Sequence, residues 1–102
     1  MKYSIIKYQF ANGTPEDWHR EVISFIAALD SDPELKGRIS YRCMKNRGDS
    51  GYFHLAGAAD DLAIKTLQSR DFFKAYQAKT HAVAADGNVT VTPVELIAET
   101  AG

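Results

Sequence analysis

The chain has 102 residues, 45% of them hydrophobic and 25% charged, with a formal net charge of −1. This length predicts one domain, residues 1–102, with a single core, and the composition is ordinary for a soluble globular protein. A charge so near zero gives no electrostatic reason to expect nucleic acid or an anionic membrane as a partner.

Targeting signals are not expected in this sequence. No apolar run approaches the length of a membrane span, and Lys7 and Gln9 interrupt the only apolar stretch near the start, so we expect no signal peptide. Cys43 is the only cysteine, which excludes an internal disulfide and suits a reducing compartment. The sequence therefore predicts a cytoplasmic protein.

The first half of the chain predicts a strand, a helix and a hairpin. Residues 2–10 alternate Tyr and Ile with polar residues, as a strand does. Thr14 can cap a helix that begins at Pro15, and an apolar stripe follows at helical spacing: Trp18, Val22, Phe25, Ile26 and Leu29. Residues 30–37 end this helix, and residues 38–46 and 51–58 predict two further strands.

The segment between these two strands contains Arg47-Gly48-Asp49, a tripeptide that adhesion receptors recognise. If the apolar faces of the two strands coincide, with residues 39, 41 and 43 beside residues 53, 55 and 57, the loop must have an odd number of residues. We therefore expect a three-residue turn, in which Gly or Asp tolerates left-handed geometry. A turn explains the tripeptide better than an adhesion function does.

The second half predicts a broken helix and a final strand. The helical region begins at Asp60-Asp61, breaks near Ser69 and continues to about residue 84. A turn at residues 86–88 precedes a long strand, residues 89–99, in which Pro93 requires a bend or a sheet edge. The element order β-α-β-β-α-β predicts an α+β, ferredoxin-like fold with a four-stranded antiparallel sheet.

Both faces of the predicted sheet carry apolar residues, which points to a homodimer. We assign to the helix-covered face Tyr3, Ile5, Ile39, Tyr41, Cys43, Phe53, Leu55, Val89 and Val91. The other face then holds Ile6, Tyr8, Phe10, Met44, Tyr52, Val94 and Leu96, mixed with Ser4, Arg42, His54, Thr90 and Thr92. Exposing so much apolar surface would forgo roughly 25 cal/mol per Å², so we expect a second copy to cover that face.

The broken helix also carries a family resemblance. Ser69-Arg70-Asp71-Phe72-Phe73 resembles the "SPHF"-like helix restart of the dimeric α/β-barrel superfamily, in its antibiotic-biosynthesis-monooxygenase-like branch. The resemblance extends over nearly the whole chain in element order. It implies a homodimeric barrel with a pocket between helices and sheet in each protomer. It also implies one of the activities of that branch, which includes cofactor-independent oxygenases of phenolic or quinol-like aromatics and haem-degrading enzymes.

Haem is not expected as a cofactor. The haem-degrading members use an Asn on the first strand and a Trp and a His around the second helix, whereas this chain has no Asn in residues 2–10 and its only Trp is Trp18. We therefore expect no cofactor, and whether the protein is an enzyme stays open. Asp60-Asp61 is interpreted as a helix cap and not as a metal site, because no third ligand is near in the sequence.

Three residues are candidates for proton transfer: His54, His81 and Tyr76. Arg42 would lie beside His54 on the second sheet face and disfavour its protonation, leaving a neutral base. The alternative for His54, a hydrogen-bonded histidine at a subunit interface, is favoured. His81 could point into the pocket from the second helix, or lie on its surface.

Five residues are candidates for binding an aromatic substrate: Tyr41, Phe53, Phe72, Phe73 and Arg42. Aromatic residues clustered on a helix are more often core residues, and that alternative stays open here. Two functions remain: a cofactor-independent monooxygenase acting on a small aromatic or quinol-like compound, or a non-catalytic dimer that binds a small ligand or serves in a stress response.

Overall fold

A four-stranded sheet with strand order β2-β3-β1-β4 forms one layer of the molecule. The structure is a computed structural model and describes residues 1–102. Its elements are β1 (Lys2–Gln9), α1 (Pro15–Ser31), β2 (Ile39–Lys45), β3 (Gly51–Ala58), α2 (Asp61–Gln68), α3 (Asp71–Val83), the short turn η1 (Ala85–Gly87) and β4 (Thr90–Val94). All neighbouring strands are antiparallel. The predicted ferredoxin-like α+β fold is confirmed.

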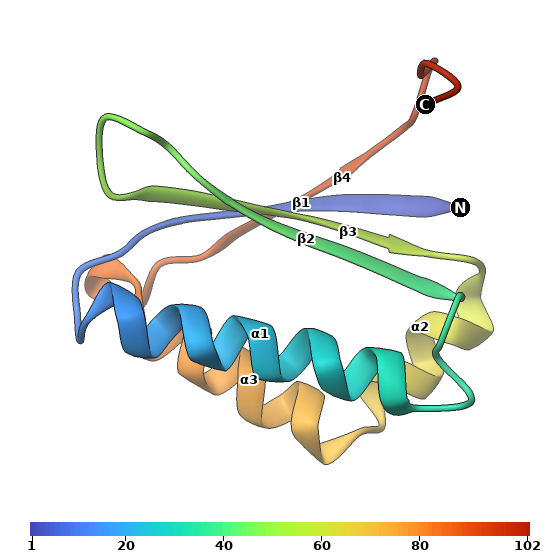
Figure 1. The fold of residues 1–102 in the computed structure, drawn as a ribbon, viewed down its shortest axis with the longest axis horizontal. Coiled ribbons are helices and arrows are strands. Elements are labelled where there is room, and N and C mark those ends of the chain that lie inside the picture. Colours follow the sequence, from blue (N-terminus) through green and yellow to red (C-terminus); the bar gives the residue numbers. More distant parts are fainter.

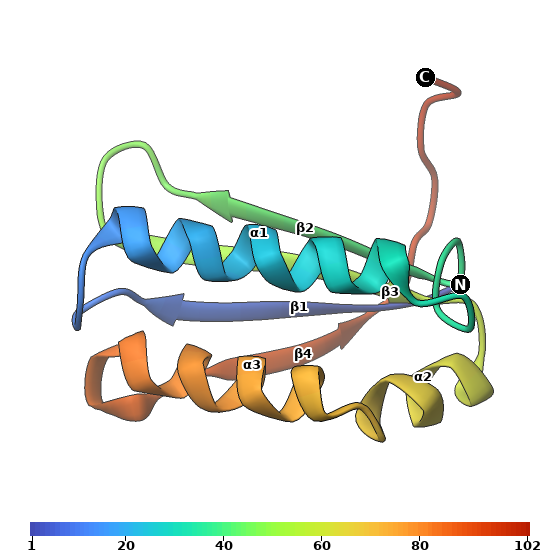
Figure 2. The same ribbon diagram turned by 60° about the horizontal axis from the view of Figure 1, so that its bottom comes forward.

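The helices form the second layer and all lie on one side of the sheet (Figure 1). Figure 2 shows α1 and α3 running along the strands, with α2 at an angle beyond the N-terminal end of α3. The opposite side of the sheet carries no helix, so the protomer has an inner, helix-covered sheet face and an outer, uncovered one. None of the helices combines the length and the apolar character that crossing a membrane requires.

Local capping signals set the helix boundaries. The Thr14 hydroxyl accepts a hydrogen bond from the Asp17 amide (3.2 Å), and the Asp60 carboxylate accepts one from the Ala63 amide (2.8 Å). Both predicted caps are confirmed. The helix break near Ser69 is also present, but Ser69 ends α2 instead of beginning α3, because its hydroxyl donates to the carbonyl of Thr66 (2.6 Å).

The hairpin loop between β2 and β3 has four residues, 47–50, and the prediction of three was wrong. The Asn46 amide donates to the Gly51 carbonyl (2.8 Å) and closes the loop. The Asp49 carboxylate accepts from the Asn46 side chain (3.0 Å) and from the Gly51 amide (2.7 Å). Through these two hydrogen bonds Asp49 stabilises the turn.

The even loop reverses the predicted faces of β1 and β3. His54 pairs with Cys43 on one side and Ile6 on the other, so its side chain lies on the inner face. Phe53 and Leu55 consequently lie on the outer face, as do Tyr3 and Ile5. The predicted faces of β2 and β4 were correct. Polar Lys7 and Gln9, which alternate with Ile6, Tyr8 and Phe10, indicate the observed orientation of β1.

The core lies between the inner sheet face and the helices. Its most bulky member is Trp18, which is 2% exposed and anchors α1 as its apolar stripe predicts. The buried cluster consists of Tyr8, Trp18, Val22, Phe25, Leu29, Leu35, Tyr52, Tyr76 and Ala84. The core therefore includes three tyrosines, whose hydroxyl groups need hydrogen-bond partners when buried.

The last strand is shorter than predicted. β4 ends at Val94, which pairs with Tyr3 close to the start of β1, so the protomer offers no partner strand beyond this point. Residues 95–102 have no regular structure and lead away from the sheet (Figure 1). Pro93 lies in an edge strand, as expected of a residue without an amide hydrogen.

One ion pair ties the helix break to the rest of the helical layer. The Arg70 guanidinium at the start of α3 donates to both carboxylate oxygens of Asp32 at the end of α1, at 2.7 and 3.3 Å. Both side chains are partly shielded, which makes this pair stronger than the exposed pairs of the molecule. It lowers the pKa of Asp32, chiefly through these hydrogen bonds.

We expect Asp32→Asn to lower the free energy of unfolding more than the control below does, because it leaves Arg70 with only the longer and more exposed contact to Glu34 (3.4 Å). The matched control is Glu21→Gln, which removes a more exposed ion pair with Lys79 and should cost less than about 0.5 kcal/mol. Urea unfolding measures both values. Equal losses in the two variants would contradict a special role for the Asp32–Arg70 pair.

Candidate functional site

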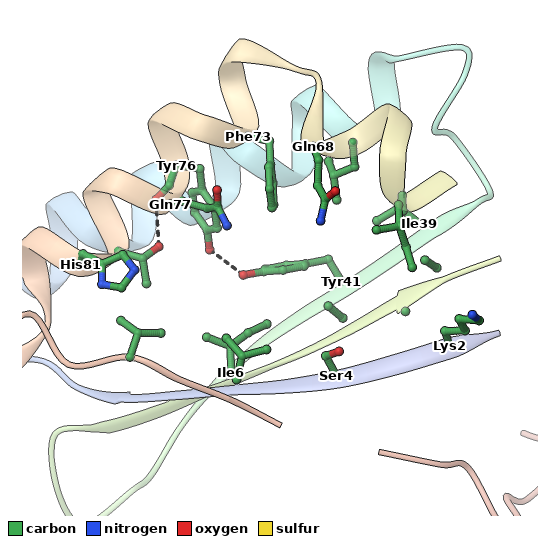
Figure 3. A pocket seen from close by; sticks show the side chains of 18 residues that line it. Lys2, Ser4, Ile6, Ile39, Tyr41, Gln68, Phe73, Tyr76, Gln77 and His81 are labelled. Atoms are coloured by element: carbon green, nitrogen blue, oxygen red, sulfur yellow. Dashed lines mark hydrogen bonds between the residues drawn. The ribbon is translucent and has the colours of Figure 1, made fainter. Parts of the chain in front are cut away.

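A cavity of about 310 Å³ lies between the inner sheet face and helices α2 and α3. Figure 3 shows His81 at one end of it and Lys2 and Ile39 at the other. Most of its walls are apolar, and its polar side chains belong to Lys2, Ser4, Tyr41, Gln68, Tyr76, Gln77, Thr80 and His81. A concave, apolar space with a few polar groups is the usual form of a small-molecule site.

Tyr76 is held in place by aromatic rings of α1. Its ring stacks on Phe25, with centroids 3.9 Å apart and planes 4° apart, and on Trp18, at 5.7 Å and 12°. These contacts fix the ring, so its hydroxyl has a defined position at the cavity wall. Figure 3 shows that hydroxyl directed toward the hydroxyl of Tyr41, 3.0 Å away.

Behind this tyrosine pair lies a buried hydrogen-bond network. The Tyr41 hydroxyl bonds to Nδ1 of His54, which also has the Tyr76 hydroxyl within 3.3 Å. On the other side of the ring, Nε2 of His54 bonds to the Tyr8 hydroxyl (2.7 Å), and the Trp18 indole donates to Tyr8 (2.8 Å). We call these five residues, Trp18, Tyr8, His54, Tyr41 and Tyr76, the Tyr–His network.

His54 is neutral in this network. It is 0% exposed, and burial lowers its pKa from 6.5 to about 4. The predicted cause, a neighbouring Arg42, was wrong, because Arg42 pairs with Leu55 and lies on the outer face. The cost of burying a charged ring keeps the imidazole unprotonated at neutral pH.

The other titratable groups of the network are neutral as well. Burial raises the pKa of Tyr8, Tyr41 and Tyr76 above the usual tyrosine value. It also raises the pKa of the Cys43 thiol, which lies 3.3 Å from Nε2 of His54, to about 11. The interior wall of the cavity therefore offers hydroxyl groups and no charge.

His81 differs from His54 in being exposed. Its Nδ1 lies 2.9 Å from the carbonyl oxygen of Gly87, which can only accept a hydrogen bond. We assign the hydrogen to Nδ1 on this ground, so that in the neutral ring the free lone pair is on Nε2. His81 thus places a hydrogen-bond acceptor at one end of the cavity.

The structure brings four of the eight predicted site residues to the cavity: Tyr41, Phe73, Tyr76 and His81. His54 lies directly behind them, one hydrogen bond away. Phe72 packs against Phe25 outside the cavity, as a core residue does. Arg42 and Phe53 are on the outer face, so the structure does not place them in this site.

Sequence reasoning missed Tyr8, and it missed Gln77 and Thr80. Tyr8 was assigned to the outer face together with His54, through the same error of register. Gln77 lies four residues after Phe73, and Thr80 lies four residues after Tyr76, so helical spacing places both on the cavity side of α3. Thr80 bonds to the backbone carbonyl of Tyr76 (2.9 Å).

Fold and cavity together define a class: a small ferredoxin-like α+β protein with a ligand-sized space between sheet and helices. Several solved structures share this fold. PA3566 from Pseudomonas aeruginosa is 19% identical, covering 95% of this chain and 94% of its own, with a TM-score of 0.72. A dimeric ferredoxin-like protein of unknown function from Jannaschia sp. CCS1 is 20% identical, covering 93% and 98%, with a TM-score of 0.71.

The cofactor-independent oxygenase SnoaB from Streptomyces nogalater has the same fold. It is 12% identical, and the match covers 99% of this chain and 98% of SnoaB with a TM-score of 0.72. No protein-family model and no curated protein matches the sequence. The predicted resemblance is thus confirmed as a shared ferredoxin-like fold, which by itself assigns no chemistry.

The low pKa of His54 predicts a pH-dependent stability. Between pH 6.5 and 4 the unfolded chain binds a proton at His54 that the folded protein does not, so stability is complete above pH 6.5 and falls as the pH falls. The loss amounts to about 3 kcal/mol by pH 4. Urea unfolding at a series of pH values measures it.

Above pH 5 most carboxylates are still ionised, so the change in the free energy of unfolding with pH should come from His54 there. This change should be absent in His54→Gln and retained in His81→Gln. The same slope in wild type and His54→Gln would show that another group causes it.

Proposed function

We propose that this protein binds a small aromatic or quinol-like compound in the cavity and oxygenates it without a cofactor. One observation carries the proposal: a single apolar cavity has the Tyr41–Tyr76 hydroxyl pair in its wall and Nε2 of His81 at its end. The pair can hold a substrate oxygen, while His81 can accept a proton from a phenolic hydroxyl.

Size and shape favour a flat ligand of one or two rings. The cavity volume of about 310 Å³ is near the lower limit of small-molecule sites, which range from about 300 to 1,000 Å³. Phe73 and Ile6 face the space from opposite layers (Figure 3), so a ring could lie between apolar side chains of the helix and of the sheet.

The reaction balances without a further reductant. A phenol transfers its hydroxyl proton to His81, and the electron-rich phenolate gives electrons directly to dioxygen. A carbon–oxygen bond forms at a ring C–H position, and the O–O bond breaks. One oxygen stays on that carbon as a carbonyl, giving a quinone, and the other leaves as water with the phenolic and the ring hydrogen. The ring thus supplies all the electrons that dioxygen accepts.

The role of His81 is tested by oxygen uptake with a dihydroxyaromatic substrate. We expect His81→Ala to reduce the rate about a hundredfold, the order of magnitude of general base catalysis. The control is His19→Ala, which removes an exposed histidine of α1 outside the cavity. Unchanged uptake in His81→Ala would remove this residue from the mechanism.

A non-catalytic, ligand-binding function is the second candidate. It is favoured by the neutrality of the Tyr–His network, since a histidine with a pKa of about 4 is a weak proton acceptor. Binding of an aromatic compound without any oxygen uptake in the wild-type protein would support this second function and overturn the first.

We further propose that the protein is a homodimer in which the outer sheet faces meet. The outer face carries Tyr3, Ile5, Phe53 and Leu55 and no covering helix (Figure 1). Ile97, which follows the end of β4 in the C-terminal segment, is 87% exposed. A second copy would bury these groups, and the structurally similar Jannaschia protein is dimeric.

The dimer is tested by Phe53→Lys, which places a charge in the middle of the proposed interface. We expect the mass measured by light scattering to fall from that of a dimer to that of a monomer, because an unpaired buried charge is strongly unfavourable. Ile23→Lys is the matched control, since Ile23 is 66% exposed on the helical layer. A wild-type monomer, or a Phe53→Lys dimer as stable as wild type, would contradict this interface.

A further inference from the structure

The Tyr–His network holds one polar hydrogen more than its contacts use. The Trp18 indole, the three hydroxyl groups of the network and the ring of neutral His54 each contribute one such hydrogen, five in all. The hydroxyl groups are those of Tyr8, Tyr41 and Tyr76. Four contacts link them in a row: Trp18 to Tyr8, Tyr8 to His54, His54 to Tyr41, and Tyr41 to Tyr76. Each contact uses one hydrogen, so one remains without a partner in the row.

The Trp18 end of the row fixes the direction of the bonds. An indole can only donate, so the Tyr8 oxygen accepts from Trp18. The Tyr8 hydrogen then has one acceptor within reach, Nε2 of His54. The Cys43 thiol, the other neighbour of Nε2, keeps its own hydrogen because burial raises its pKa. Nε2 is therefore the bare nitrogen, and Nδ1 carries the hydrogen of the ring.

The remaining hydrogen consequently lies at the cavity. Nδ1 of His54 donates to Tyr41, the nearer of its two hydroxyl neighbours. Tyr41 and Tyr76 share one hydrogen between them, and whichever hydroxyl donates in that contact, the other has a free hydrogen. Both residues line the cavity. Nothing buried behind them can accept it.

We propose that the Tyr–His network fixes the Tyr41–Tyr76 wall as a hydrogen-bond donor, so that the ligand oxygen placed there accepts a hydrogen bond and is best a phenolate or carbonyl oxygen. Trp18, Tyr8 and His54 act as positioning residues, because they set the direction of the bonds without touching the ligand. The ligand class rests on the proposed function, but the inference does not depend on the oxygenation step.

A consequence for binding is that the cavity favours the ionised form of a phenol. A hydroxyl that donates to a phenolate makes a stronger bond than one that donates to a neutral phenol. Bound phenols should therefore have a lower pKa than free ones.

The probe is para-nitrophenol, whose absorbance reports its ionisation. We expect wild-type protein to bind the anion about ten times more tightly than the neutral form. Tyr8→Phe should reduce this ratio toward one, because Nε2 can then carry the ring hydrogen and the bonds of the row can reverse. The control Tyr52→Phe removes a hydroxyl that bonds to His19, from a ring stacked on Tyr8, and should leave the ratio unchanged.

Nitrogen NMR of the His54 ring tests the fixed direction without a ligand. We expect the hydrogen on Nδ1 in wild type and in Tyr52→Phe, and a population with the hydrogen on Nε2 in Tyr8→Phe. A wild-type His54 with its hydrogen on Nε2, or a protein that binds the neutral probe in preference or binds no probe, would overturn the inference. If the wild-type protein gives these binding and NMR results but shows no oxygen uptake, only the proposed oxygenation is overturned.

Discussion

The burial of an uncharged histidine among hydroxyl groups is the constraint on which the rest of this structure depends. His54 can be buried only if both ring nitrogens have partners, because an unpaired polar group in the core costs as much as the bond it lacks. Tyr8 and Tyr41 provide these partners from the two strands that flank β3. The sheet register, the choice of aromatic residues in the core and the polarity of the cavity wall all follow from this arrangement.

The helical layer adds rigidity to the same arrangement. Phe25 and Trp18 hold the ring of Tyr76 between them, and the Arg70–Asp32 pair joins the helix break to the end of α1. A site built on stacked rings and short hydrogen bonds changes little when a ligand arrives, so little ordering is needed on binding. This arrangement suits a small cavity, where each polar group must already point in the right direction.

Signals within a few residues of each other could be predicted from the sequence, and pairings between distant residues could not. Thr14 and Asp60 mark helix starts because a cap bonds to an amide three residues away. The helical spacing of Phe73, Tyr76 and His81 places them together on α3 in the same way. The final strand was predicted too long because its composition does not reveal where its partner β1 begins. The face of β3 depended on whether a loop has three or four residues, which its turn-forming residues alone do not decide, whereas Lys7 and Gln9 do indicate the face of β1.

That loop shows how a surface segment can control a buried site. Residues 47–50 are exposed and line no part of the cavity, yet their number decides which way every side chain of β3 points relative to β2. Adding or removing one residue there would turn His54 outward and Phe53 inward, unless a β-bulge absorbed the change. In evolutionary terms, the exposed positions of this turn other than Asp49 can be substituted, whereas its length can change only in steps of two.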